Sequence, residues 1–188
     1  PIRLAALYPT SGSLALLGEE SWRGARIAVD ELNAAGGIDG REVELVQADV
    51  PDVNAATSEA RRLLDAEGLD LAVGTYSSAL ALAASEVYAR GGGPYIELGA
   101  VSLEFNERGY ENVLRTNPNA GDMSEAQLDF IVNWVAPELG IELGELDVLL
   151  VHEDSSYGSS LARSFEENAE AEGITNVSAS PYSAESTD

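Results

Sequence analysis

The feature that most constrains this chain is a repeated alternation between short apolar segments and longer segments with helical spacing. Apolar runs of strand length, such as residues 2–8 and 43–49, are each followed by apolar residues spaced three and four positions apart. This alternation is typical of a parallel sheet whose strands are joined by crossover helices. We therefore predict an α/β fold built from doubly wound parallel sheets.

The first part of the chain contains four predicted strands with three helices between them. Glycines end the first helix at Gly36-Gly37, and Ser77-Ser78 are expected to cap the third. The predicted strands are residues 2–8, 43–49, 70–74 and 95–98, and the predicted helices include residues 22–32, 56–64 and 77–90.

The pattern lapses between residues 99 and 119, which we predict to be a connection with a short strand at 113–116. A second series then begins. Its predicted elements are a helix near 123–135, a strand at 146–151, a helix at 159–172 and a strand at 176–179. We assign residues 1–118 to a first lobe and 119–188 to the beginning of a second, incomplete lobe, since one strand–helix–strand unit cannot bury both faces of a sheet.

The charge is strongly negative, with 33 Asp and Glu against 10 Arg, no lysine and a formal net charge of −23. Such a surface repels phosphate backbones and anionic lipid, so nucleic acid is not an expected partner. The acidity indicates a solubility device or adaptation to high salt; attraction of a cationic ligand is the alternative. Cysteine is absent, which excludes disulfides and thiol catalysis.

We expect no direct membrane insertion, because no apolar run approaches the ~20 residues that span a bilayer. The chain starts directly in its first strand pattern, so a signal or lipid-anchor segment is absent from this stretch.

Signals for enzymatic chemistry are weak. A phosphate-binding P-loop needs a lysine, and neither a Gly-x-Gly-x-x-Gly turn nor a Gly-x-Ser-x-Gly elbow occurs. We interpret His152, the only histidine, as a hydrogen-bonded residue at a strand end. Asp49, Asp52, Glu153 and Asp154 match no calcium loop, so no metal, cofactor or catalytic residue is predicted.

A ligand cleft remains as the functional candidate. In open α/β sheets, ligands bind beyond the carboxyl ends of the strands, and three such ends here are polar or rich in glycine. Ser77 and Ser78 follow one of them at a predicted helix start, where free N–H groups favour an anionic group such as a carboxylate. The alternative is that these serines only cap their helix.

Several short motifs follow one another in an order known from one family. They are Ser11-Gly12 with Gly18, the stretch Leu32-Asn33-Ala34-Ala35-Gly36-Gly37-Ile38-Asp39-Gly40-Arg41, Gly74 with Ser77-Ser78, Gly99-Ala100, Arg108-Gly109-Tyr110, and His152-Glu153-Asp154-Ser155-Ser156-Tyr157-Gly158. Together they resemble the leucine/isoleucine/valine-binding family of type I periplasmic solute-binding proteins, over nearly the whole chain.

The resemblance implies two similar lobes that trap a small solute, and members about twice as long as this chain. It implies that Ser78, with Ser77 beside it, holds a ligand carboxylate, and that the Gly99 carbonyl, next to Ala100, receives an α-ammonium. Tyr157 of the second lobe would close over the ligand. The side-chain pocket would be lined by Leu17 and Tyr76.

Two positions depart from that family pattern. Val101 stands where amino-acid binders usually carry a threonine, and Ser102 follows on an extended segment where neighbouring side chains point to opposite sides. Glu97 stands near the cleft end of an otherwise apolar strand. It either receives a cationic or amide group of the ligand or bonds to the backbone of the connecting loop.

The resemblance therefore implies the substrate-binding component of an ABC importer, periplasmic or held at the cell surface as a lipoprotein. It would capture an amino acid or another small carboxylate and present it to the permease and ATPase subunits. The alternative is a ligand-sensing domain of a receptor or of an amide-responsive regulator with the same fold. An enzyme of doubly wound α/β type is a further alternative.

Overall fold

A computed structural model of the chain describes residues 1–183, which form two compact units. The first unit comprises Pro1–Ala100 and Phe105–Asn117, and the second comprises Val101–Glu104 and the described residues from Pro118 onward. Residues 184–188, the end of the predicted second lobe, lie outside the described residues. That the two units are ligand-binding lobes with the predicted limits stays a prediction.

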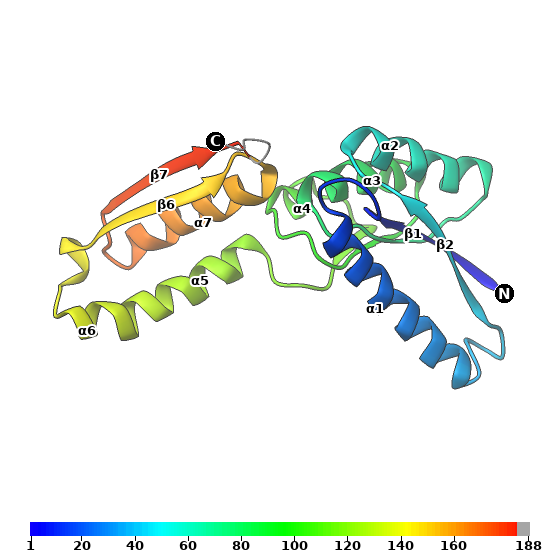
Figure 1. Cartoon of the computed structure of the whole chain (residues 1–188), viewed down its shortest axis with the longest axis horizontal. Coiled ribbons are helices and arrows are strands. Elements are labelled where there is room, and N and C mark those ends of the chain that lie inside the picture. The colour runs from blue at the N-terminus through cyan, green and yellow to red at the C-terminus, as the bar shows by residue number, and fades with distance from the viewer. Residues whose placement is uncertain (184–188) are drawn as a thin grey trace. The chain divides into compact units, whose positions relative to one another are not determined.

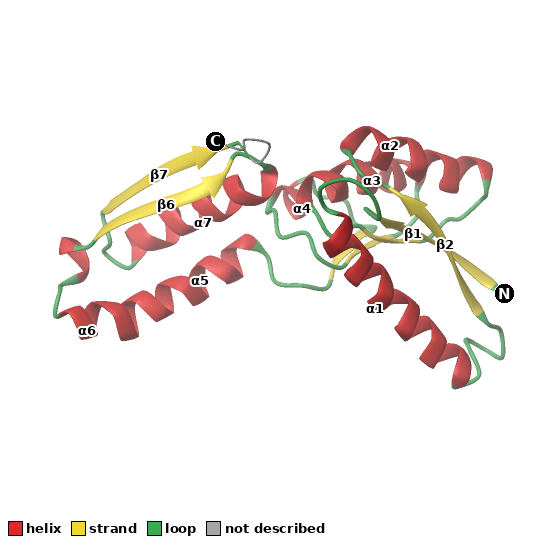
Figure 2. Ribbon diagram, in the orientation of Figure 1, coloured by secondary structure: helices red, strands yellow, loops and turns green. Residues whose placement is uncertain are grey.

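The first unit is built on a parallel five-stranded sheet in the order β2-β1-β3-β4-β5, and the predicted α/β class is confirmed (Figure 2). The short strand predicted inside the connection is the edge strand β5. Residues 5–8 of β1 are all fully buried, because helices cover both faces of the sheet. The strands are β1 (Ile2–Tyr8), β2 (Val43–Asp49), β3 (Ala72–Gly74), β4 (Tyr95–Glu97) and β5 (Val113–Arg115).

Helix α1 lies on one face of this sheet, and α2 and α3 pack side by side on the other (Figure 1). The core between α2, α3 and the sheet contains Leu63, Tyr88, Tyr95 and Phe105, each at most 1% exposed. The helices are α1 (Ala15–Ala34), α2 (Val53–Arg61), continued by a π-helical turn (Arg62–Ala66), α3 (Ser78–Gly91) and the single turn α4 (Glu104–Glu107).

Helix α3 ends at Gly91, one residue past its predicted limit. Gly92 takes a left-handed conformation with φ of 81°, which a residue without Cβ adopts at little cost. The cap predicted at the start of α3 is wrong in one respect. Ser77 occupies the N-cap position, but its side chain makes no capping hydrogen bond.

The second unit contains a parallel pair of strands, β6 (Asp147–Glu153) and β7 (Asn176–Tyr182). Leu128 of α5 and Phe165 of α7 pack with Val148 and Leu150 of β6 in its core. Its helices are α5 (Ala120–Phe130), a π-helical turn (Ile131–Val135), α6 (Ala136–Leu139), a 3-10 turn (Leu143–Glu145) and α7 (Ser156–Ala171).

Capping explains why two helices of this unit begin earlier than predicted. The Asn119 side chain accepts from the N–H groups of Gly121 and Asp122, and the Asp122 carboxylate accepts from the N–H of Asn119. The Ser155 side chain accepts from the N–H of Gly158 at the start of α7. Neither cap belongs to the apolar spacing from which the helices were predicted.

Within residues 1–183, no helix combines the length and the apolar character that crossing a membrane requires.

Candidate functional site

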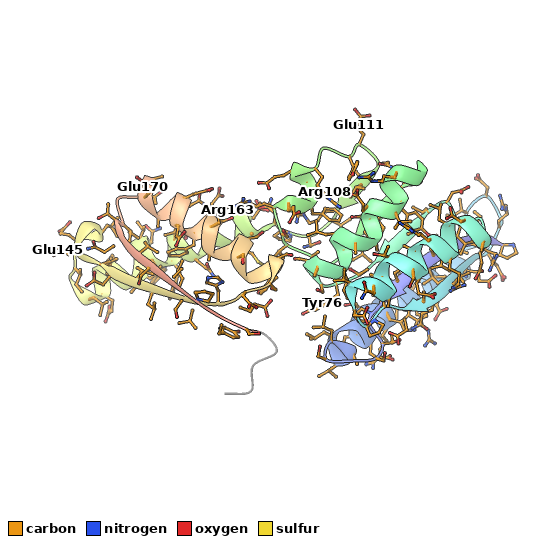
Figure 3. All side chains as sticks on the ribbon, turned by 90° about the horizontal axis from the view of Figure 1, so that it is seen from above. Tyr76, Arg108, Glu111, Glu145, Arg163 and Glu170 are labelled. Carbon is orange, nitrogen blue, oxygen red and sulfur yellow. The ribbon has the colours of Figure 1, made fainter. Side chains whose placement is uncertain are left out.

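The loops that follow β1, β3 and β4 share one edge of the first sheet, because parallel strands end on the same side. Leu7 of β1 is in register with Gly74 of β3, and Gly74 with Glu97 of β4. The predicted site residues of the first unit follow these strand ends. Tyr76, labelled in Figure 3, lies in the turn that leads from β3 into α3.

The Glu97 carboxylate joins two of these loops. The Glu97 side chain is fully buried, and its Oε1 accepts the N–H of Tyr76 at 3.2 Å and those of Gly99 and Ala100 at 2.9 Å each. Its Oε2 accepts the N–H of Thr75 at 2.7 Å and the hydroxyl of Tyr95 at 3.2 Å. The sequence left two roles open for Glu97, binding a ligand group or bonding to loop backbone. These contacts agree with the second role.

Burial dominates the electrostatics of this cluster. It raises the pKa of Glu97, although the N–H groups of Ala100, Gly99, Thr75 and Tyr76 act in the opposite direction. Burial, and then the Glu97 charge, also raise the pKa values of Tyr95 and Tyr8. The Tyr95 hydroxyl therefore stays protonated and donates to the carboxylate.

The loops after β3 and β4 pack closely against each other, and the backbone of the first is unusual. Tyr76 has a φ of 110°, which L-residues rarely adopt. A Cβ on Gly99 would lie 2.9 Å from the Tyr76 Cα, so the two loops are in direct contact there. A Cβ on Gly74 would lie 2.1 Å from the Leu7 carbonyl oxygen, so only glycine fits at the end of β3.

Ser77 and Ser78 stand at the start of α3. Ser77 is extended, with φ of −84° and ψ of 140°, and Ser78 is the first helical residue and 2% exposed. The first N–H groups of a helix have no partner within the helix, and the helix dipole is positive there. This end of α3 therefore has the electrostatic character that favours an anion.

The loop after β1 is held by Asp49 of β2. Its carboxylate accepts the N–H of Thr10 at 2.8 Å, the N–H of Ser11 at 3.1 Å and the Ser11 hydroxyl. Burial raises the pKa of Asp49, but these hydrogen bonds outweigh it and leave the pKa below the ordinary value. The loop leads into α1, whose first turn carries the predicted pocket residue Leu17, 43% exposed.

Val101 and Ser102 belong to the second unit. Both are buried, and the Val101 carbonyl accepts the N–H of Ala120 at 2.8 Å. The Ser102 hydroxyl lies 3.0 Å from that of Ser160 on α7, so it already has a protein partner.

The predicted residue Tyr157 lies in the first turn of α7, with 44% of its surface exposed. It lines a groove of the second unit with Leu149, Val151 and Tyr182, among other residues. Its role toward a ligand stays a prediction from the family resemblance.

Four of the five polar residues considered for metal or catalytic chemistry, Asp49, Asp52, His152 and Glu153, have side-chain partners within the protein. His152 donates from Nδ1 to the Glu153 carbonyl at 2.8 Å, which confirms a hydrogen-bonded histidine at a strand end. Asp52 caps α2 by accepting the N–H of Ala55 at 2.8 Å, and the Glu153 carboxylate accepts the Ser155 hydroxyl. In the described part of the chain, no three His, Asp or Glu residues are grouped so that they could hold a metal ion.

The structure thus brings Tyr76, Gly99 and Ala100 together through Glu97. Sequence reasoning missed Thr75 and Tyr95, which bind the same carboxylate, and the loop-holding role of Asp49. Asp49 ends β2 and Thr75 directly follows β3, so both carry a signal, a polar residue at the carboxyl end of a strand, whereas Tyr95 begins β4 and carries none. The strand pattern gives that position but not the partner.

Comparison with known proteins decides the family. Residues 1–188 match the family model described as periplasmic binding protein. The chain belongs to this family. Two curated relatives are Leu/Ile/Val-binding protein homolog 8 of Brucella abortus, 48% identical, and homolog 7 of Brucella suis, 44% identical, each over 187 residues. The alignments cover 100% of this chain but 46% and 47% of those relatives, so this periplasmic binding protein chain spans about half their length.

Solved structures with the same fold include branched-chain amino acid binders. The substrate-binding protein LivJ of Streptococcus pneumoniae, in complex with isoleucine, matches with a TM-score of 0.81 and 26% identity over 100% of this chain and 51% of that one. A leucine-binding protein of Thermotoga maritima matches with a TM-score of 0.84 and 22% identity, over 100% and 51%.

A third match is a solute-binding protein of Rhodopseudomonas palustris in complex with 3,4-dihydroxybenzoic acid. Its TM-score is 0.77 at 19% identity, over 97% of this chain and 48% of that one. These likenesses confirm a type I periplasmic binding fold for the part of it that this chain covers.

Proposed function

We propose that this chain supplies ligand-binding residues of an extracytoplasmic solute-binding protein that serves an ABC importer. The solute is a small carboxylate, such as an amino acid. The observation that carries the proposal is the start of α3 at the carboxyl edge of the first sheet. There the buried Ser78 and the helix N–H groups stand after the loop that Glu97 binds, in a position suited to an anion.

In this proposal, the Ser78 hydroxyl and amide bind the carboxylate of the solute. The Gly99 carbonyl stands in the loop that packs on Tyr76 and accepts the ammonium group of an amino acid. The relatives support a carboxylate as the common group, because isoleucine and 3,4-dihydroxybenzoic acid, bound by two of the structural neighbours, both carry one.

We propose permease and ATPase subunits as partners. This proposal is supported by family membership and by the name of LivJ, a substrate-binding protein of a branched-chain amino acid transporter. The extracytoplasmic location has the same support.

A thermal-shift screen of the complete natural protein tests this function. The panel contains leucine, isoleucine, valine, aliphatic amides, 3,4-dihydroxybenzoate and short dicarboxylates. A ligand at about 100 times its dissociation constant adds ~2.7 kcal/mol to the free energy of unfolding and raises the melting temperature by several degrees. A folded protein whose melting temperature no carboxylate raises would contradict the proposal.

The pattern of hits also tests position 101. If Val101 has replaced a threonine that contacts the α-ammonium, carboxylates without that group should give larger shifts than their α-amino counterparts. Larger shifts with leucine, isoleucine or valine would mean that Val101 is compatible with α-amino acids.

A further inference from the structure

The buried carboxylate of Glu97 receives donors from two loops that are far apart in the sequence. Thr75 and Tyr76 belong to the loop after β3, and Gly99 and Ala100 to the loop after β4. The first pair lies 22 and 21 residues before Glu97, so a single side chain joins two segments that the chain does not hold together locally.

The hydrogen-bonding capacity of this carboxylate is fully used. A carboxylate offers about four lone-pair sites on two oxygens. Glu97 accepts from four backbone N–H groups and from the Tyr95 hydroxyl, and its side chain is 0% exposed. A ligand ammonium or amide would have to displace one of these donors and reach a buried atom.

The loops also depend on the carboxylate. A buried charge without hydrogen bonds is strongly unfavourable. Movement of either loop that removed its N–H groups from the Glu97 carboxylate would therefore cost free energy. The Tyr76 backbone, with its φ of 110°, and the close contact between Gly99 and Tyr76 are features that such an anchor can hold in place.

We propose that Glu97 is a positioning residue of the ligand site: it holds the loops after β3 and β4 in one arrangement and does not itself contact the solute. The inference rests on the proposed function, because one of these loops leads into Ser78 and the other contains Gly99. It assigns Glu97 a role different from that of a receptor for a cationic ligand.

The test compares E97Q with E86Q in the complete natural protein. Glutamine keeps the size of the side chain but is neutral and replaces one acceptor oxygen by an NH2 donor, so all four N–H groups lose a charged acceptor and at least one loses its acceptor altogether. Glu86 of α3 is a matched control, because its carboxylate also binds a tyrosine hydroxyl, that of Tyr110, and two arginines, yet none of the loop amides.

Amide hydrogen exchange without any ligand is the first readout. A lost hydrogen bond to a charged group corresponds to about 10- to 100-fold faster exchange. We expect this acceleration at Thr75, Tyr76, Gly99 and Ala100 in E97Q, with the amides of β1 unchanged, and no acceleration at the four positions in E86Q. Unchanged exchange at these positions in E97Q, or equal acceleration throughout the first unit, would overturn the proposal.

The wild type provides a second measurement that does not depend on the folding of E97Q. On acidification, the four amide proton resonances should move with one midpoint, which is also that of the Glu97 carboxyl carbon. Tyr8 and Tyr95, whose pKa values are raised by burial and then by the Glu97 charge, stay protonated throughout. Four amides with unrelated midpoints would contradict a shared anchor.

Titration with leucine, isoleucine, valine and 3,4-dihydroxybenzoate is the third readout. A solute that binds the wild type should bind E97Q about tenfold or more weakly and E86Q equally well. Equal affinity for E97Q would overturn the positioning role. If none of these solutes binds the wild type, the result counts against the proposed function for these solutes. The hydrogen-exchange measurement, which uses no ligand, still decides whether Glu97 anchors the loops.

Discussion

Single residues at the carboxyl edge of the first sheet are constrained from two directions, by the hydrogen bonds that hold the loops and by the space left between them. Glu97 supplies the first constraint and Gly99 the second. Sequence alone identified Glu97 as unusual, because a charged residue interrupts an apolar strand. It left two roles open, since the deciding donors on Thr75 and Tyr76 come from another loop.

We expect G99A to disturb this edge. Its Cβ would lie 2.9 Å from the Tyr76 Cα and 3.1 Å from the Tyr76 carbonyl oxygen, which are backbone atoms that cannot rotate away. Overpacking of this kind costs about 1–3 kcal/mol, measured as the free energy of unfolding in urea.

The control for G99A is G24A in α1, where no atom lies within 4 Å of the added Cβ. Replacing an exposed helical glycine by alanine is expected to stabilise the protein by about 0.5–1 kcal/mol. Equal effects of the two substitutions would mean that Gly99 is not constrained by Tyr76.

The pH dependence of stability should report the burial of Glu97. Burial raises its folded-state pKa above the ordinary 4.5, so the folded state binds this proton more tightly than the unfolded state does. The stability that this group contributes is fully present below pH 4.5 and is lost as the pH rises through the folded-state pKa.

We therefore expect the free energy of unfolding of the wild type, minus that of E97Q, to increase as the pH falls from about 7 toward the ordinary pKa of glutamate. Urea titrations of both proteins at a series of pH values measure this difference. A difference that stays constant or decreases over the range would contradict a raised pKa.

At the scale of secondary-structure elements, apolar spacing predicted the strands and helices well, and local hydrogen bonds set their ends. The edge strand β5 and the break after α3 were both predicted. The single turn α4 was not, because four residues carry no readable periodicity. The serine at the start of α3 predicted a capping hydrogen bond. Whether that bond forms depends on the orientation of the serine side chain, which cannot be read from the sequence.

Two helix starts of the first unit provide a matched test of capping. The Asp52 carboxylate accepts the N–H of Ala55 at 2.8 Å, whereas the Ser77 side chain makes no capping bond at α3. We expect D52A to lower the free energy of unfolding by about 0.5–2 kcal/mol and S77A to change it by much less. A loss in S77A as large as that in D52A would contradict the assigned caps.

At the scale of the whole molecule, the dominant property is the net charge of −23. Like charges on a compact protein repel one another and reduce the stability of the folded state. The Debye length falls from about 30 Å at 0.01 M salt to about 3 Å at 1 M, so added salt weakens this repulsion.

The melting temperature should therefore rise with sodium chloride over this range. A control variant with six exposed glutamates changed to glutamine should rise less, because it has less repulsion to screen. Suitable positions are Glu19, Glu31, Glu125, Glu138, Glu142 and Glu170. Equal salt responses of the two proteins would mean that screening of the acidic surface is not the cause.

The central claim is that the start of α3 binds the carboxylate of the solute. Its most direct test is calorimetric titration of the complete natural protein, as wild type, S78A and S58A, with the carboxylate that raises the melting temperature most. Ser58 is an exposed serine of α2 and serves as the control. The account predicts a dissociation constant about 10- to 100-fold higher for S78A and unchanged for S58A, as expected for a lost hydrogen bond to a charged group. Equal dissociation constants for all three proteins would contradict it.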